Sequence, residues 1–543
     1  MPQRRMKPLA LLDASQRRLF ASPAVVLLAV ALTACGGASA RVVSPDRGAE
    51  APGRAVRGRV LYEARSATAT GASLAVEQRP ARHVRVDAVD AAGAVVGTTA
   101  ADELGAFELA VPPGAVELVV VAELRHEGTS LAVTVDPGGA QPHRMRVPLA
   151  DAGGEMLLLA REASAAGFSG ALHILDTLLR GMQAARAWTG RELPPVFAYW
   201  GRGVTRTWSY YRGERPEGSG RYCIELLGGD PGQQATSDTD EHDEAIILHE
   251  LGHFVMDSLS TDSSPGGDHP AGYLIDPGLA WEEGRASWFA TAVLGRPYYQ
   301  DTIGLEPQGR FRVDHDLELG SRGPRGIGSE LGVGQILWDL ADGAGGLADA
   351  DADPVALGPA LVLTGMMELR EVPGAYPAIS SFLRHLVDNG SVTEGAVKRL
   401  LADGGHPPEV LPQRGGADWP RDVALPARVS GKIDGLTNPA PSGGPNRPQN
   451  GVDAVKVYRV EVPRRGRLSA QLRIFGSGAV ADRQDLDLEL RDTRANLLDS
   501  SRGEGPIEAL SRIVEPGFYV IYVRDGGNGN RAAFELRVVV EPL

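Results

Sequence analysis

Two histidines four residues apart, His249 and His253, constrain this chain more than any other feature of its sequence. Residues at this spacing lie on one face of an α-helix, so both imidazoles can reach a single metal ion. Glu250 follows the first histidine, where a carboxylate can take a proton from a water molecule that the metal activates. The alternative is a solvated helix that carries two histidines and a glutamate without a metal.

The residues around this pair favour an amphipathic helix. Asp240, Glu241 and Asp243 come before it, and acidic side chains are favourable at a helix N-terminus. The face opposite Glu250 and His253 is apolar and consists of Ile247, Leu251, Phe254 and Val255. The sequence therefore predicts a helix that packs on one side and presents a metal-binding face on the other.

A catalytic zinc ion takes three protein ligands and keeps one position open. One known pattern, with a glycine and a third histidine three and six residues after the second histidine, is excluded because Met256 and Leu259 stand there. Residues 281–289 are predicted to form a later helix that ends at residues 295–297. This helix offers Glu282 and Glu283 as a third ligand.

The two-histidine helix and the later Glu283-Gly284-Arg285-Ala286 segment together resemble the gluzincin metallopeptidases. The resemblance implies an α+β zincin-like domain with one catalytic Zn²⁺ held by His249, His253 and Glu283. It makes Glu250 the catalytic base and Glu282 an exposed neighbour of the third ligand. Thermolysin-like enzymes have an aspartate where this chain has Ser287, so the groups that orient the ligands must differ.

The same resemblance implies that a hydrogen-bond donor stabilises the oxyanion formed during peptide hydrolysis. The candidates are Tyr273, Tyr298, Tyr299, His269 and His315. The strand that ends at residues 225–229 is a candidate edge for pairing with an extended substrate. The Gly-Ala-Met-Glu-Asn motif of the aminopeptidase branch is absent from the sequence, which favours an endopeptidase.

The N-terminus predicts an export signal over residues 1–35, because basic residues precede a short apolar run at residues 24–32. The signal ends in Leu32-Thr33-Ala34-Cys35, which resembles the lipobox of bacterial lipoproteins and implies a lipid on Cys35. Gly36 follows instead of the aspartate that retains lipoproteins at the inner membrane, which favours the outer membrane. Residues 36–55 are predicted to be a flexible tether. Cys223 then lacks a disulfide partner and is expected to be a small buried side chain.

Short alternating apolar runs predict antiparallel β-sandwiches at residues 56–150 and 423–543. The first resembles carboxypeptidase regulatory-like modules and the second resembles bacterial pre-peptidase C-terminal domains. Residues 151–414, with mainly helical patterns, are predicted to hold the metallopeptidase domain. Asp482, Asp485 and Asp487 could bind calcium, although such acids more commonly lie on a solvated strand face.

The net charge of −14, without a basic cluster beyond the first 18 residues, disfavours a nucleic-acid-binding protein. The expected function is that of a membrane-anchored zinc metalloendopeptidase that hydrolyses peptide or protein substrates. Two alternatives stay open, namely a weak or inactive protease-like binding lipoprotein and a zinc hydrolase that acts on another amide. The presence of Glu250 together with all three ligands favours an active enzyme.

Overall fold

The computed structural model describes residues 54–68, 71–149, 155–164, 167–204, 208–233, 236–261, 264–266, 269, 272–304, 311–320, 323–412, 419–434, 451–476, 485–503, 505–526 and 531–543. The predicted signal, Cys35 and residues 36–53 of the tether therefore lie outside the described residues. Among the described residues, the structure has no helix that is long and apolar enough to cross a membrane.

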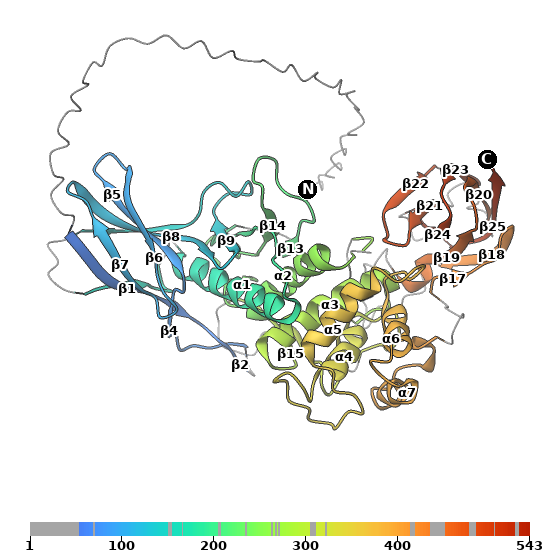
Figure 1. The fold of residues 1–543 in the computed structure, drawn as a ribbon, viewed down its shortest axis with the longest axis horizontal. Coiled ribbons are helices and arrows are strands. Elements are labelled where there is room, and N and C mark those ends of the chain that lie inside the picture. The colour runs from blue at the N-terminus through green and yellow to red at the C-terminus, as the bar shows by residue number, and fades with distance from the viewer. Residues whose placement is uncertain are drawn as a thin grey trace, which may run out of the picture. The chain divides into compact units, whose positions relative to one another are not determined.

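Two main sheets and the short β2–β3 pair make up the N-terminal part of the described chain (Figure 1). In the smaller sheet β1 pairs with β4, β7 and β11, and the larger sheet has the order β13-β14-β12-β9-β8-β5-β6 with β10 beside β8. The expected β-sandwich-like N-terminal region is confirmed. The strands are β1 (Arg54–Ala64), β2 (Ala67–Thr68), β3 (Gly71–Ala72), β4 (Glu77–Pro80), β5 (Val84–Asp90), β6 (Val95–Ala100), β7 (Ala106–Val111), β8 (Ala115–His126), β9 (Thr129–Thr134), β10 (Arg144–Pro148), β11 (Met156–Ala160), β12 (Val196–Tyr199), β13 (Tyr210–Tyr211) and β14 (Tyr222–Glu225).

The larger sheet continues from the N-terminal strands into the middle of the chain. Strand β9 pairs in parallel with β12, and β12 pairs in parallel with β14. A single apolar core includes Val84 of β5, Leu131 of β9, Val196 of β12 and Leu251 of the histidine helix. The boundary expected near residue 150 therefore coincides with no break in this sheet or in this core.

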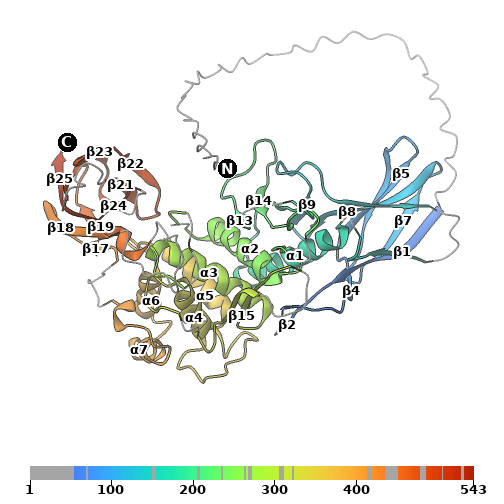
Figure 2. The same cartoon turned by 180° about the vertical axis from the view of Figure 1, so that it is seen from behind.

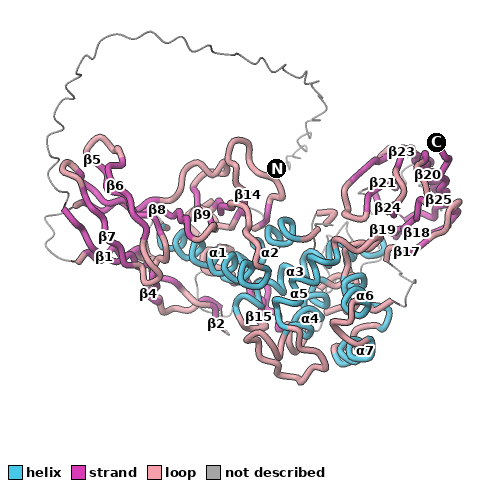
Figure 3. Tube along the Cα trace, viewed as in Figure 1, coloured by secondary structure: helices cyan, strands magenta, loops and turns pink. Residues whose placement is uncertain are grey.

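The helices, which are cyan in Figure 3, come from the middle of the chain. They are α1 (Phe168–Thr189), α2 (Glu244–Leu259), α3 (Pro277–Leu294), α4 (Glu330–Ala341), α5 (Gly358–Leu369), α6 (Ile379–Asp388) and α7 (Glu394–Asp403). Helix α1 packs against α2, α3 and α5, and α3 lies between α2 and α4 (Figure 2). The predicted helix around His249 and His253 and the predicted later helix at residues 281–289 are confirmed as α2 and α3. Two short strands, β15 (Tyr298–Thr302) and β16 (Phe311–Asp316), form a hairpin between α3 and α4.

The C-terminal strands form two sheets with the orders β17-β19-β24-β21-β22 and β18-β25-β20-β23. Their facing apolar side chains make a core of their own, which includes Leu468, Leu488, Ile521 and Leu536. The strands are β17 (Arg421–Asp422), β18 (Ala427–Asp434), β19 (Val455–Val462), β20 (Gly466–Gly476), β21 (Leu486–Asp492), β22 (Leu497–Ser501), β23 (Ile507–Val514), β24 (Gly517–Asp525) and β25 (Arg531–Pro542).

Candidate metal centre

Two glycines let the helices that carry the predicted ligands approach closely. A methyl group on Gly252 of α2 would lie 3.0 Å from Cα of Ala286 on α3. A methyl group on Gly284 of α3 would lie 2.5 Å from Val333 of α4. A side chain at Gly284 would collide with Val333 and one at Gly252 would press tightly against Ala286, so the two glycines allow α2, α3 and α4 to come into contact beside His253 and Glu283.

The structure brings the three predicted ligands together. Nε2 of His249 lies 3.1 Å from Nε2 of His253, and each of these nitrogens lies 3.2 Å from Oε2 of Glu283. His249 and Glu283 are buried and His253 is partly buried. One nitrogen or oxygen atom from each residue thus faces the same point, as a shared metal ion requires.

The distances suit zinc. Zinc binds histidine nitrogen and carboxylate oxygen at about 2.0–2.2 Å in a tetrahedron, whose ligand atoms are therefore roughly 3.3 Å apart. The three separations of 3.1–3.2 Å match the edges of such a tetrahedron. Two imidazoles and one carboxylate are also a donor set that catalytic zinc sites use.

Ser287 on α3 contacts the first histidine. Its hydroxyl Oγ lies 3.1 Å from Nδ1 of His249, and the serine is buried. When Nδ1–H donates this hydrogen bond, Nε2 keeps its lone pair and faces Glu283. At the position where thermolysin-like enzymes have an aspartate, the Ser287 hydroxyl therefore orients the His249 ring.

Glu250 is 7% exposed and lies beside the ligands on α2. Burial raises the pKa of its carboxyl group, and the charge on Glu283 raises it further, against the opposing effect of His249 and His253. A backbone hydrogen bond from Tyr211 of β13 also reaches this carboxylate. A buried carboxylate with a raised pKa is a stronger base than one in water, as a proton acceptor in catalysis should be.

The charges at the centre are strongly coupled. Burial alone would raise the pKa of Glu283, but His269 and His253 outweigh it and hold this pKa well below the usual range. Burial lowers the pKa of His253, but Glu283 reverses this effect and raises it to about 9. The site thus pairs a buried carboxylate with positive charge, which a bound dication would also supply.

Two of the oxyanion candidates lie at the centre. Nε2 of His269 is 3.4 Å from Oε1 of Glu283, and its Nδ1 is 3.2 Å from Oε2 of Glu330 on α4. The ring of Tyr299, which is buried, lies 5.4 Å from the ring of His249. Glu330 is a site residue that the sequence did not indicate, since it reads only as the first residue of a buried helix.

The other three candidates differ in position. The side chain of Tyr298 is 45% exposed at the start of β15. His315 pairs with Tyr299 across the β15–β16 hairpin. Burial lowers the pKa of His315, and the negative charge of Glu330 opposes this effect. Tyr273 is half-buried and packs against the main apolar core. No contact with a predicted ligand is found for these three within the described part of the chain.

The prediction that Glu282 is an exposed neighbour is wrong. Glu282 is 1% exposed, and its carboxylate forms an ion pair with Arg285, which is equally buried. The Arg285 guanidinium also donates a hydrogen bond of 2.8 Å to the carbonyl of Thr261. Helix α3 is buried on nearly all its faces, so its charged side chains form ion pairs inside the protein instead of meeting water.

The expected substrate-pairing edge is covered. Strand β14 pairs with β12 on one side and with β13 on the other, where Tyr211 lies opposite Ile224. The short strand β13 is therefore the outer strand here, and an open hollow of about 620 Å³ lies beside it. Its lining residues are Tyr210, Arg212, Glu214, Arg215, Pro216 and Glu217.

The acids before α2 stand at its N-terminus, as predicted. Asp243 is the N-cap residue, but its carboxylate accepts hydrogen bonds from the amide and hydroxyl of Thr302 instead of from the helix. Asp238, Asp240 and Asp301 gather beside it. Burial and mutual repulsion raise the pKa of Asp301 to about 8.

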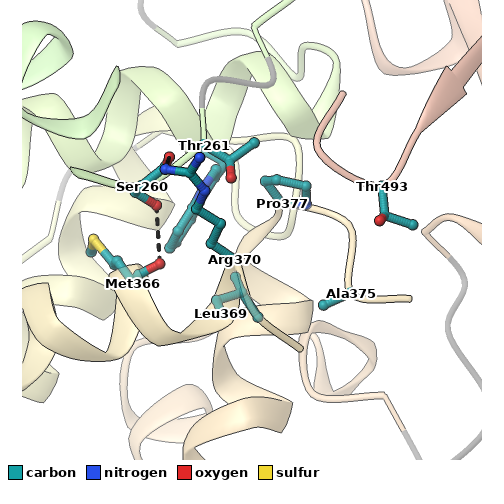
Figure 4. A pocket seen from close by; sticks show the side chains of 9 residues that line it. Ser260, Thr261, Met366, Leu369, Arg370, Ala375, Pro377 and Thr493 are labelled. Carbon is teal, nitrogen blue, oxygen red and sulfur yellow. Dashed lines mark hydrogen bonds between the residues drawn. The ribbon is translucent and has the colours of Figure 1, made fainter. Parts of the chain in front are cut away.

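A further small pocket lies away from the metal centre, beside α3 and α5 (Figure 4). Ser260, Trp281, Met366 and Leu369 line it, and the Ser260 hydroxyl donates a 3.0 Å hydrogen bond to the Met366 carbonyl. None of the predicted site residues belongs to its lining.

Of the proposed C-terminal calcium ligands, Asp482 lies outside the described residues. Cys223 is a buried free cysteine, as predicted.

The comparisons with known proteins find only weak similarity. The sequence matches no family model and no curated protein. Among solved structures, the chain resembles the pre-peptidase C-terminal domain of a collagenase from Bacillus anthracis, with 15% identity over 22% of this chain and 91% of that one and a TM-score of 0.16. It also resembles PliG, a periplasmic lysozyme inhibitor from Aeromonas hydrophila, with 12% identity over 22% of this chain and 96% of that one and a TM-score of 0.14.

Proposed function

We propose that this chain is a zinc metallopeptidase of the gluzincin type that cleaves peptide bonds internally. The observation that carries the proposal is the triangle of His249, His253 and Glu283, whose facing atoms lie 3.1–3.2 Å apart. Glu250 lies on the same helix, is buried and has a raised pKa, which suits a proton acceptor. Ser287 supports His249 from the opposite side of its ring.

Zinc, when bound, supplies Lewis acidity that polarises a carbonyl group and lowers the pKa of water. The side chains of the chain itself do the rest. His249, His253 and Glu283 hold the ion, and Ser287 fixes the tautomer of His249. Glu250 accepts a proton from the attacking water and transfers it to the amine that leaves. His269 and Tyr299 are the donors best positioned to stabilise negative charge on the carbonyl oxygen, because both lie within the centre.

The export signal, the lipid on Cys35 and a location at the bacterial outer membrane belong to this proposal. An anchored enzyme with strands on both sides of its helical part would act on peptide or protein substrates near the membrane surface. The hollow beside β13 supports a peptide substrate, because Tyr211 of β13 also contacts Glu250. A second candidate is an inactive binding lipoprotein that keeps the zinc ligands without turnover.

The test is the substitution Glu250→Gln in the full-length protein. We expect the variant to retain one zinc ion per chain and to lose casein cleavage by about 100-fold or more, since it lacks the proton acceptor. Glu283→Gln should lose the zinc ion itself. A matched control is Glu244→Gln on the same helix, whose carboxylate contacts Arg79 and His173 instead of the metal centre.

The outcomes separate the candidates. Zinc binding without cleavage of casein or of other amides by the unmodified protein favours the binding lipoprotein. Cleavage of another amide but not of casein favours a different zinc hydrolase. Full activity of the Glu250→Gln variant contradicts the assigned base.

A further inference from the structure

Six carboxylates gather at the far end of α4 from Glu330. Asp339 and Asp342 come from the end of α4, and Glu318 follows β16. The other three alternate along the loop between α4 and α5 as Asp349-Ala350-Asp351-Ala352-Asp353. We propose that this cluster binds a calcium ion at a site separate from the metal centre, and this proposal does not rest on the proposed peptidase activity.

The backbone already shapes the loop around the carboxylates. Oε1 of Glu318 accepts hydrogen bonds from the amides of Ala350 at 2.5 Å and Asp351 at 3.1 Å. Oδ1 of Asp349 accepts from the amide of Ala352 at 2.6 Å. One carboxylate oxygen from each of Glu318, Asp349 and Asp351 lies within 4.8 Å of the other two. Three oxygen ligands are thus in place for one ion.

The surroundings of Asp342 favour a cation at this cluster. The residue is 0% exposed, and within the described residues no N–H or O–H donor reaches either of its carboxylate oxygens, which face the Glu318 carboxylate instead. Oδ1 of Asp339 and Oδ2 of Asp353 are buried without a partner in the same way. A buried carboxylate oxygen without a donor loses the hydration of its charge, so a cation among these oxygens would compensate for a large cost.

Repulsion among the carboxylates supports this argument. Burial, followed by the charges of Glu318 and Asp353, raises the pKa of Asp342 to about 8. Burial and the charges of Asp351 and Asp349 raise the pKa of Asp353 to about 7. The positive charge of Arg325 interacts with the Asp339 carboxylate, whereas Asp403 adds further negative charge near Asp351 and Asp353. Within the described residues, none of the six carboxylates forms an ion pair with a lysine or arginine.

The donor chemistry selects calcium. The candidate ligands are all carboxylate oxygens, which suit hard cations, whereas zinc prefers nitrogen and sulfur. Calcium takes six to eight oxygens in flexible geometry, and aspartates at alternate positions of a loop are a common way to supply them. Such an ion would tie the end of α4 to β16 and to the loop before α5.

The experiment uses the full-length, zinc-loaded protein from which calcium has been removed. Terbium is the first probe, because the Trp338 indole donates a 2.6 Å hydrogen bond to Oε2 of Glu318 and so lies beside the site. We expect terbium luminescence excited through tryptophan that saturates and that calcium displaces. Asp351→Asn should weaken calcium binding by about tenfold or more, since fewer charged ligands lower affinity. The control Glu371→Gln removes an exposed charge elsewhere and should change nothing.

Thermal unfolding gives a second measurement that does not depend on terbium. Calcium should raise the melting temperature of the unmodified protein by at least about 2 °C. Asp342→Asn should abolish this rise, and without calcium it should melt no lower than the unmodified protein, because asparagine replaces a carboxyl group whose charged form burial and its neighbours disfavour. The proposal is overturned if calcium displaces no terbium and shifts no melting temperature, or if Asp351→Asn binds calcium as tightly as the unmodified protein. Loss of peptidase activity in the Glu250→Gln variant leaves both measurements unaffected.

Discussion

Replacing Ser287 with alanine tests how the metal centre is organised. The substitution removes one buried hydrogen bond of 3.1 Å to Nδ1 of His249 and leaves all three ligands in place. A neutral hydrogen bond of this kind contributes about 1 kcal/mol, and groups that orient metal ligands affect affinity by about 10- to 100-fold. Because a single hydroxyl acts on one ligand of three, we expect zinc to bind about five- to tenfold more weakly.

The assay is a competition for zinc between the protein and a fluorescent chelator of known affinity. Ser287→Thr keeps the hydroxyl and should restore the affinity. Ser169→Ala is the matched control, since this serine is also buried but donates to the carbonyl of Glu63 instead of contacting a ligand. If Ser287→Ala and Ser169→Ala have the same zinc affinity as the unmodified protein, Ser287 does not orient His249 and the argument fails.

Three further predictions concern buried ionisable groups. Glu282→Gln should lower the free energy of unfolding by about 3–5 kcal/mol by leaving Arg285 unpaired, while zinc content measured on the folded protein stays at one ion per chain. Without calcium, the free energy of unfolding should fall between about pH 5 and pH 8. The pKa values of Asp342 and Asp353 are raised to about 8 and about 7, so over this range the folded protein holds protons that the unfolded chain has already lost. In denaturant titrations at several pH values, saturating calcium should flatten this pH dependence. Cys223, buried and with a pKa raised to about 11, should react with a thiol reagent only after unfolding, measured in the Cys35→Ala variant; reaction in the folded state would contradict its burial.

The helices and the pairing of the two histidines could be predicted because both depend on local spacing. His249 and His253 are four residues apart, and α-helical geometry alone puts them on one face. Glu283 required a family resemblance, since Glu282 beside it has the same chemistry. The structure distinguishes them by their partners, because Glu282 meets Arg285 and Glu283 meets the histidines.

The sheet that joins β9 to β12 could not be predicted in the same way. This pairing is parallel and brings together residues more than 60 positions apart, so no local pattern at Thr134 or Tyr199 indicates it. Burial of acids was also missed, although the alternating Asp349, Asp351 and Asp353 are visible in the sequence. Charged residues are usually exposed, and only the fold shows that Glu318 and Asp342 are buried and that Glu318 accepts a hydrogen bond from this loop.

Helix α4 links the two proposed metal sites. Its first residue, Glu330, contacts His269 at the proposed zinc centre, Asp339 lies in its last turn and Asp342 follows directly as its C-cap. The close packing of Val333 against Gly284 fixes α4 on the helix that carries Glu283. Side chains in such close contact transmit small shifts, because the interior has little free space. An ion that holds the far end of α4 would therefore also hold Glu330 and His269 in place, so calcium removal should disturb the zinc centre through α4 before it unfolds the chain.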